Sequence, residues 1–117
     1  MKTLFLDIET SPNVCYTWGL YNENIGINQV IEPTRVICVA SKCDGQPMDF
    51  TAECQPGGHK RMVKRVHGML EAPDAVVHYN GARFDEPHLN REVLQYGLAP
   101  TSQYRTIDLF QTVRKGF

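Results

Sequence analysis

Two acidic residues interrupt an apolar stretch near the start of the chain, at Thr3–Thr10. Alternate side chains of a strand point to the same face, so Asp7 and Glu9 project together while the intervening apolar residues face the other way. Burying acids in an apolar sheet costs free energy, and like charges this close oppose each other's ionisation. We therefore expect a positive ligand between the carboxylates. A divalent cation bound to a substrate phosphate is the obvious candidate.

The size and charge of the chain restrict its class. Its 117 residues suffice for one domain, and 42% hydrophobic and 21% charged residues are ordinary for a soluble globular protein. A formal net charge of -1 excludes a strong global attraction for polyanions, so a nucleic-acid site must be a local patch. No apolar stretch approaches the roughly 20 residues of a membrane-spanning helix. We therefore expect a cytoplasmic protein with no membrane partner.

The cysteines have two interpretations. In a chain without an export signal, reduced thiols are the expectation. A zinc site with Cys38, Cys43, Cys54 and His59 as ligands is the alternative. The spacing lacks the tight Cys-x-x-Cys pairs of common zinc modules, and Cys38 lies inside the strand-like run 36–40. Plain thiols are therefore favoured.

Strand signals dominate the first half of the chain. Bulky and β-branched residues recur between turn signals, and the hairpin-type dipeptide Asp44-Gly45 separates the last two runs. We expect strands at 4–8, 14–21, 35–41 and 48–51, with an irregular loop at 22–33. Consecutive strands joined by turns favour an antiparallel ribbon.

Helices and strands alternate in the second half. A helix is expected at 59–70, because an apolar stripe recurs there with three-and-four spacing: Met62, Val63, Val66, Met69 and Leu70. A strand at 75–79, a helix at 86–96, a strand near 104–107 and a helix at 109–115 should follow. Strand-helix-strand units favour right-handed parallel crossovers, so the sequence predicts an α/β protein with a mixed sheet.

Two groups of polar or aromatic side chains remain ambiguous. Basic residues on the far side of the first helix either follow a phosphate backbone or form a solvated helix face, and the solvated face is favoured: Lys60, Arg61, Lys64 and Arg65. Aromatic residues of the second strand either stack on bases or pack within the strand, and packing is favoured: Tyr16, Trp18 and Tyr21.

A third acid follows the buried strand at 75–79. The turn dipeptide Asn80-Gly81 leads to Phe84 and Asp85 at the entrance of a helix, and Pro87 suits the first helical turn. Asp85 is therefore either the N-cap of this helix or a functional acid at the carboxyl end of a strand, where open α/β sheets carry their sites.

Together these motifs show a family resemblance. Asp7-Ile8-Glu9-Thr10, followed by Asn-Gly-x-x-Phe-Asp-x-Pro-x-Leu at 80–89, resembles the first two motifs of the DEDD family of 3′–5′ exonucleases. That family includes the proofreading domains of DNA polymerases, and this variant is similar to small exonuclease-like proteins of bacteriophages. The resemblance implies a ribonuclease H-like fold, in which a three-stranded antiparallel ribbon and parallel strands form one mixed sheet with flanking helices.

The resemblance also implies a two-metal site with Mg²⁺ or Mn²⁺. Asp7 would bridge both cations, Glu9 would bind the one that carries the nucleophilic water, and Asp85 would help to hold the second. Thr10 and Asn80 would line the pocket of the terminal nucleotide, and Phe84 would pack or stack near it. Asn80 alternatively serves only the turn, and Phe84 is favoured as a core residue. The spacing of His78 and His88 assigns them no role.

The chain departs from the family at the third motif, a Tyr or His followed four residues later by Asp. Tyr104-x-x-x-Asp108 fits this spacing, but the segment has the pattern of a strand entering a helix, with Asp108 as a natural N-cap. We therefore expect residues 1–117 to be an exonuclease-like domain that is incomplete at its C-terminus and carries three of four acids. Its exposed apolar surface would favour a homodimer.

The leading functional prediction is a metal-dependent 3′–5′ exonuclease that acts on single-stranded 3′ ends of DNA or RNA. A catalytically impaired or non-catalytic nucleic-acid-binding module with the same fold is the alternative, because the last acid is missing. An endonuclease of the ribonuclease H or resolvase type is disfavoured by the Asn-Gly-x-x-Phe-Asp motif at 80–85.

Overall fold

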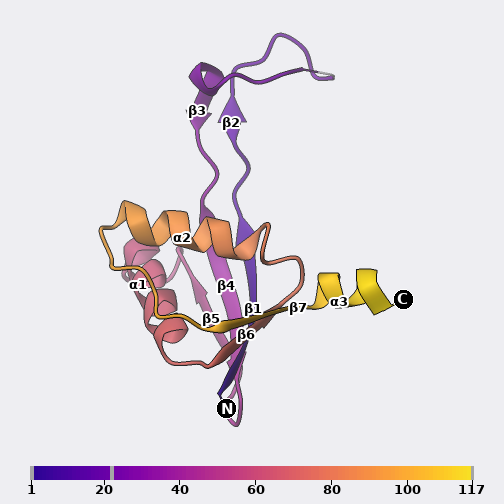
Figure 1. Ribbon diagram of the computed structural model, residues 1–117. Helices are drawn as coiled ribbons and strands as arrows, with labels where there is room; N and C mark the ends of the chain where they lie inside the picture. Colours follow the sequence, from indigo (N-terminus) through magenta and orange to yellow (C-terminus); the bar gives the residue numbers. More distant parts are fainter. Residues whose placement is uncertain (1, 22, 117) are drawn as a thin grey trace.

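A five-stranded sheet forms the centre of the computed structural model, which describes residues 2–21 and 23–116 (Figure 1). The elements in chain order are β1 (Thr3–Thr10), β2 (Val14–Cys15), the 3₁₀ helix η1 (Ile27–Gln29), β3 (Val30–Glu32), β4 (Val36–Cys43), β5 (Asp49–Ala52), α1 (Gly58–Glu71), β6 (Ala75–His78), α2 (Asp85–Gln95), β7 (Arg105–Asp108) and α3 (Leu109–Gly116).

The sheet is mixed, as the sequence predicts. Its strand order is β5-β4-β1-β6-β7. β4 pairs antiparallel with both β1 and β5, which gives the predicted three-stranded ribbon. β6 and β7 run parallel to β1 on its other side. β1 therefore lies at the centre of the sheet. β6 ends at His78, one residue after the pair Phe5–Val77, whereas β1 continues to Thr10.

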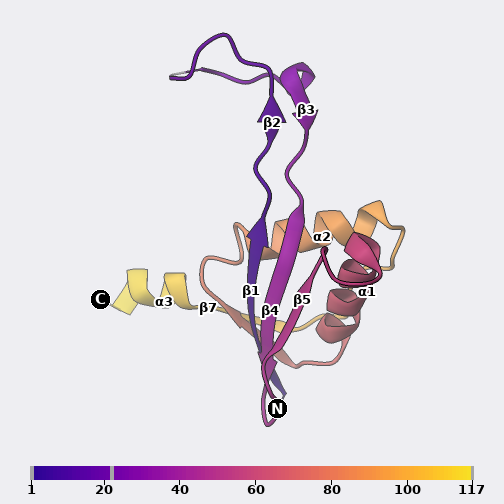
Figure 2. The same ribbon diagram turned by 180° about the vertical axis from the view of Figure 1, so that it is seen from behind.

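The helices α1 and α2 pack on the same face of the sheet, and the opposite face is uncovered (Figure 2). The core lies between the sheet and these two helices: Leu4, Leu6, Ile8, Val36, Val39, Met62, Val63, Val66, Leu70, Val76, Leu89 and Val93. Buried and exposed residues accordingly alternate along β1. Asp7 and Glu9 occupy the uncovered face and are exposed, so the expectation that this acid pair is buried is wrong.

Both large helices form where the apolar spacing predicts them. α1 extends the predicted segment 59–70 by one residue at each end, and α2 begins and ends one residue before the predicted 86–96. Met62, Val63, Val66 and Leu70 are the buried side chains of α1, because their spacing places them on one side of the helix. Among the residues that the structure describes, no helix is long and apolar enough to cross a membrane.

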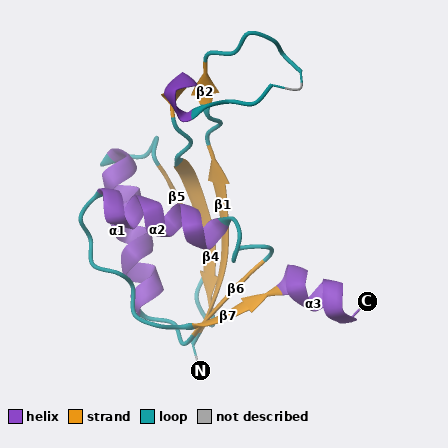
Figure 3. Ribbon diagram, turned by 45° about the horizontal axis from the view of Figure 1, so that its top comes forward, coloured by secondary structure: helices purple, strands orange, loops and turns teal. Residues whose placement is uncertain are grey.

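Residues 14–21 and 23–32 form a two-stranded arm that projects from the sheet (Figure 3). The predicted strand at 14–21 contains only the two residues of β2, and part of the predicted loop forms η1 and β3. Trp18 is 97% exposed, Tyr21 84% and Tyr16 72%, so the packing interpretation of these aromatic side chains is wrong. Strand propensity alone does not bury a side chain, because burial needs a packed partner surface.

A polar network holds the base of the arm to the body. The Ser11 backbone N–H donates to the Arg35 carbonyl oxygen at 2.8 Å. The Arg35 guanidinium pairs with Glu53 at 2.7 Å. The Glu92 carboxylate, only 1% exposed, accepts the backbone N–H of Val36 at 2.8 Å and thereby ties β4 to α2. The first residues after the arm are therefore fixed to the helix that Asp85 begins.

The four cysteines are unbonded thiols. Cys38 and Cys43 are five residues apart on β4, so their side chains point to opposite faces of the sheet. They cannot converge on one tetrahedral zinc ion, and the zinc alternative is wrong.

Candidate active site

The turn after β6 brings Asp85 to the carboxyl end of β1. Because β6 runs parallel to β1, both strands end at the same edge of the sheet, and the chain returns over that edge before α2 starts. Asp85 is the first residue of α2 and is only 4% exposed. Phe84 occupies the N-cap position and no side chain caps this helix. The N-cap interpretation of Asp85 is therefore wrong.

Burial and a neighbouring acid perturb Asp85. Desolvation, and to a smaller extent the charge of Asp7, raises the pKa of its carboxyl from 3.8 to about 6. His78 and the backbone N–H groups of Ile8 and Asp85 act in the opposite direction. Asp7 thus lies close enough to Asp85 to oppose its ionisation, which a cation between them would relieve.

Glu9 lies on the same face as Asp7, opposite Cys38 of β4. Burial raises the pKa of the Cys38 thiol, and Glu9 and Asp7 raise it further, so this thiol lies beside both acids. The uncovered face is hollowed next to them, with a volume of about 450 Å³. Residues of β1, β4 and β6, of the segments next to them and of α3 line this hollow, among them Phe5, Asp7, Lys42, Val77, Tyr79 and Leu109.

The three acids suit a hard divalent cation by their chemistry. Carboxylate oxygens are the ligands that Mg²⁺ and Mn²⁺ prefer. Within residues 2–21 and 23–116, however, no three side chains of His, Cys, Asp or Glu are already gathered around one metal position. The structure brings Asp7 and Asp85 together and leaves Glu9 two residues further along β1. A cation would therefore have to draw the three carboxylates together.

The turn residues around the acids have defined positions. Asn80 adopts a left-handed conformation with φ of 57°, and its N–H donates to Asp108 Oδ1 at 2.7 Å, so its turn role is confirmed. Thr10 ends β1 and is half-buried. Phe84 is 38% exposed and packs edge-on against His88, with ring centroids 4.8 Å apart. The interpretation of Phe84 as a core residue is therefore wrong.

His78 is a neighbour of Asp85 to which the sequence pattern assigns no role. Its ring is buried under the turn, and its Nδ1 accepts the backbone N–H of Gly81 at 3.0 Å. Its Nε2 lies 3.6 Å from Glu86 Oε2. No spacing rule could have found this residue, because its contacts depend on how the turn folds back over the strand.

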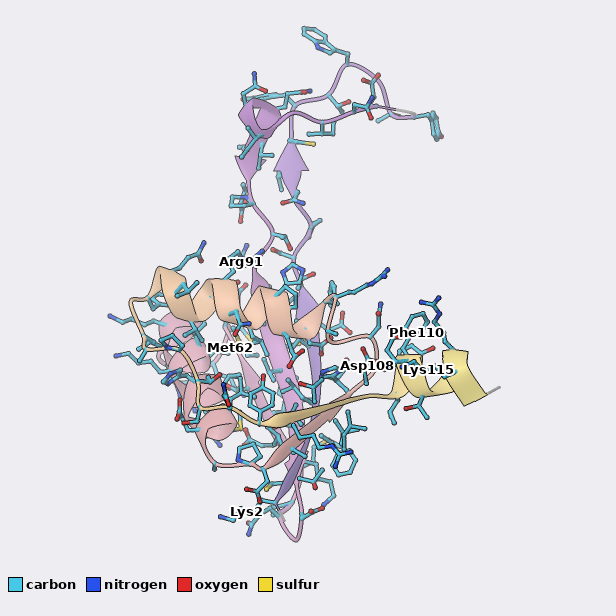
Figure 4. All side chains as sticks on the ribbon, in the orientation of Figure 1. Lys2, Met62, Arg91, Asp108, Phe110 and Lys115 are labelled. Carbon is cyan, nitrogen blue, oxygen red and sulfur yellow. The ribbon has the colours of Figure 1, made fainter. Side chains whose placement is uncertain are left out.

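Tyr104 and Asp108 are engaged in structural contacts. Asp108 Oδ1 accepts the N–H of Phe110 at 3.0 Å, which confirms Asp108 as the N-cap of α3 (Figure 4). Burial opposes ionisation of Asp108, but the backbone N–H groups of Asn80 and Phe110 hold its pKa below the ordinary value. The Tyr104 hydroxyl donates to Glu86 Oε1 at 3.1 Å. Burial and Glu86 raise the pKa of Tyr104 to about 12, so it cannot act as a base near neutral pH.

The comparisons with known proteins agree with this architecture. The family model of the RNase H superfamily matches residues 4–117. The chain belongs to the RNase H superfamily. Its fold is similar to part of the family B DNA polymerase of the hyperthermophilic archaeon Pyrobaculum calidifontis, with a TM-score of 0.66 and 17% identity. This match covers 98% of the chain and 16% of the polymerase chain. No curated protein matches the sequence.

The raised pKa of Asp85 predicts a pH-dependent stability of this RNase H superfamily chain. The pKa is about 6 in the folded chain against an ordinary 3.8. Between these values the folded chain binds more protons than the unfolded chain, so the stability from Asp85 is present below about pH 4 and is lost as the pH rises through about 6.

The Asp85→Asn variant does not titrate at this position, so we expect the melting temperature of the wild type, relative to the variant, to fall between about pH 4 and pH 7. Thermal melting in EDTA, followed by circular dichroism, measures this difference. A constant difference over that range would contradict the raised pKa.

Proposed function

We propose that this chain is a metal-dependent 3′–5′ exonuclease that hydrolyses phosphodiester bonds at nucleic-acid 3′ ends. The carrying observation is the pair of exposed acids, Asp7 and Glu9, beside the buried Asp85 with its raised pKa. Asp7 and Glu9 lie in the C-terminal half of β1, past the pair Phe5–Val77 near which β6 ends, and Asp85 follows the turn after β6. Membership of the RNase H superfamily supports a nuclease-type activity.

The roles of the side chains follow from their positions. Asp7 would contact two divalent cations, Mg²⁺ or Mn²⁺, because it lies between Glu9 on its own strand and Asp85 across the edge. Two such cations, when bound, activate a water and stabilise the leaving 3′ oxygen. With a pKa of about 6, Asp85 is mostly ionised at neutral pH, and a bound cation would favour its ionised form further. Thr10 and Asn80 would line the pocket of the terminal nucleotide, and Phe84, which is 38% exposed, would pack or stack near it.

One observation favours the alternative of a non-catalytic nucleic-acid-binding module. The acid with the spacing of the third motif, Asp108, already accepts two backbone N–H groups, from Asn80 and Phe110. A site with Asp7, Glu9 and Asp85 alone has fewer ligands than two cations prefer. Such a module would bind nucleic acid and metal without turnover.

Dimerisation through exposed apolar residues also stays a prediction. The uncovered face carries four of them: Phe5, Met48, Phe50 and Tyr79.

A cleavage assay on end-labelled single strands separates these functions. We expect Mn²⁺ to bind in calorimetry, and 5′-labelled DNA or RNA to shorten stepwise from its 3′ end until EDTA is added. Stepwise shortening would support the exonuclease. Mn²⁺ binding without turnover would favour the non-catalytic module, and cuts within the strand would favour an endonuclease. Absence of Mn²⁺ binding would overturn the proposed metal site.

A further inference from the structure

The exposed side of α1 carries a dense group of positive charges, which we call the basic helix surface: Lys60, Arg61, Lys64 and Arg65. Arg65 pairs with Asp49 at 2.6 Å. Arg61 lies near the same Asp49 and donates to Gln55 Oε1 at 3.2 Å. Among the described residues, Lys60, Arg61 and Lys64 form no ion pair. One acid thus faces four cations, and most of their charge is uncompensated.

This arrangement is unfavourable for the helix by itself. The N-terminal end of a helix favours negative charge, yet the first turn of α1 contains no acid. Lys60 and Lys64 are four residues apart, as are Arg61 and Arg65, and like charges at this spacing repel each other on a helix. A sequence that places four cations here stabilises the helix less than a mixed surface would. A bound polyanion would remove this repulsion.

The basic helix surface is also hollowed. Gly57 and the four basic side chains line an open depression of about 580 Å³. The other acid nearby, Glu53, is already paired with Arg35 at 2.7 Å. Positive side chains therefore line the depression, which is open to solvent. Asp49 is the acid at its margin.

Helix α2 connects this surface to the acids. His59 Nδ1 at the start of α1 lies 2.5 Å from the hydroxyl of Tyr96, directly after α2. Asp85 begins the same helix, whose 11 residues span about 16 Å. The exposed positions of α2 carry no acid: Pro87, Asn90, Leu94 and Gln95. Glu86 in the first turn is half-buried and accepts hydrogen bonds from Tyr104 and Thr106. Beyond it, a strand leaving the acid site along α2 would meet no exposed acid of this helix.

We propose that the basic helix surface binds backbone phosphates of a single-stranded nucleic acid, several nucleotides from the 3′ end held at Asp7 and Asp85. The inference rests on the proposed function for the position of that 3′ end. Charge complementarity carries it, because a chain of net charge -1 attracts a polyanion only through a local positive surface. A membrane surface fits less well, because no apolar side chain lies among the four cations to enter the lipid.

The double variant Lys60→Gln/Lys64→Gln tests this inference, with filter binding in EDTA of a single-stranded 20-mer between 50 and 200 mM salt. Loss of two phosphate contacts should flatten the dependence of log K on log salt by about 1.4 for the 20-mer, since each contact contributes about 0.7. Without nucleic acid, the variant should melt at a higher temperature than the wild type, because a repulsive pair is removed.

A matched control removes the same charge elsewhere. Lys2 and Lys115 lie at other edges of the molecule, away from α1 (Figure 4). An equal loss of salt dependence in Lys2→Gln/Lys115→Gln would overturn the inference, as would an unchanged slope in the α1 variant. Binding of phosphatidylserine vesicles through Lys60 and Lys64, with no effect on the 20-mer, would also overturn it. A flattened slope without any cleavage would support the surface and contradict only the proposed exonuclease.

Discussion

Replacing Asp7 with asparagine is expected to reduce metal-dependent cleavage about a thousandfold, which corresponds to about 4 kcal/mol of transition-state stabilisation. Asp7 is the one acid adjacent to both others, because it shares a face of β1 with Glu9 and raises the pKa of Asp85. Asparagine keeps the shape but removes the negative charge that a cation needs. Single-turnover rates on a labelled strand measure this loss.

The variants Asp85→Asn and Asp7→Asn/Asp85→Asn complete the test. If both residues act on the same bound cations, the double variant should lose little more activity than either single variant. The stability of Asp7→Asn serves as the control, because the exposed Asp7 should be replaceable without unfolding. Losses that multiply in the double variant would show that the two carboxylates work independently, which would contradict a shared metal site.

Gly81→Ala is expected to destabilise the fold by about 3 kcal/mol, at the upper end for overpacking of a buried site. A Cβ at this position would lie 2.2 Å from Cγ of His78, and the His78 ring is itself buried. The turn must therefore shift, and it would carry Asp85 with it. Thermal melting should show a decrease of about 12–20 °C.

Gly68→Ala is the matched control for this substitution. Gly68 lies inside α1, and nothing would lie within 4 Å of an added Cβ. Alanine should stabilise the helix there by up to about 1 kcal/mol. The pair His78→Ala/Gly81→Ala gives a second check, because removing the ring should make the alanine at 81 less costly. A melting temperature of Gly81→Ala equal to that of the wild type would contradict the close packing of the turn on His78.

The sequence predicts the mixed sheet, both large helices and the face of β1 that carries the acids. It does not predict which acids are buried. The alternation at 4–9 places Asp7 and Glu9 on one face of β1, and the structure confirms this. It does not reveal whether that face is covered, because coverage depends on where α1 and α2 pack. The alternation therefore predicts burial for Asp7 and Glu9, which are exposed. Asp85 is the buried acid, because of the turn after β6 that leads to it, and the periodicity of the sequence does not predict the shape of that turn.

The errors at the arm and at the turn have a common physical cause. Residues 14–21 have good strand propensity, but the chain offers no neighbouring strand of the main sheet at that distance from the core. The buried contact between His78 and Gly81 likewise depends on three-dimensional packing. Asp108 was interpreted correctly as a cap, because capping depends on residues next to each other in the sequence.

The exposed arm also determines what optical spectroscopy can report on this protein. Its single tryptophan, Trp18, lies on the arm with 97% of its surface in water. The indole already has the solvent contact that it would have in the unfolded chain, so its emission should change little when the core unfolds. Intrinsic fluorescence will therefore follow events at the arm, while the stability of the sheet and helices must be measured by circular dichroism.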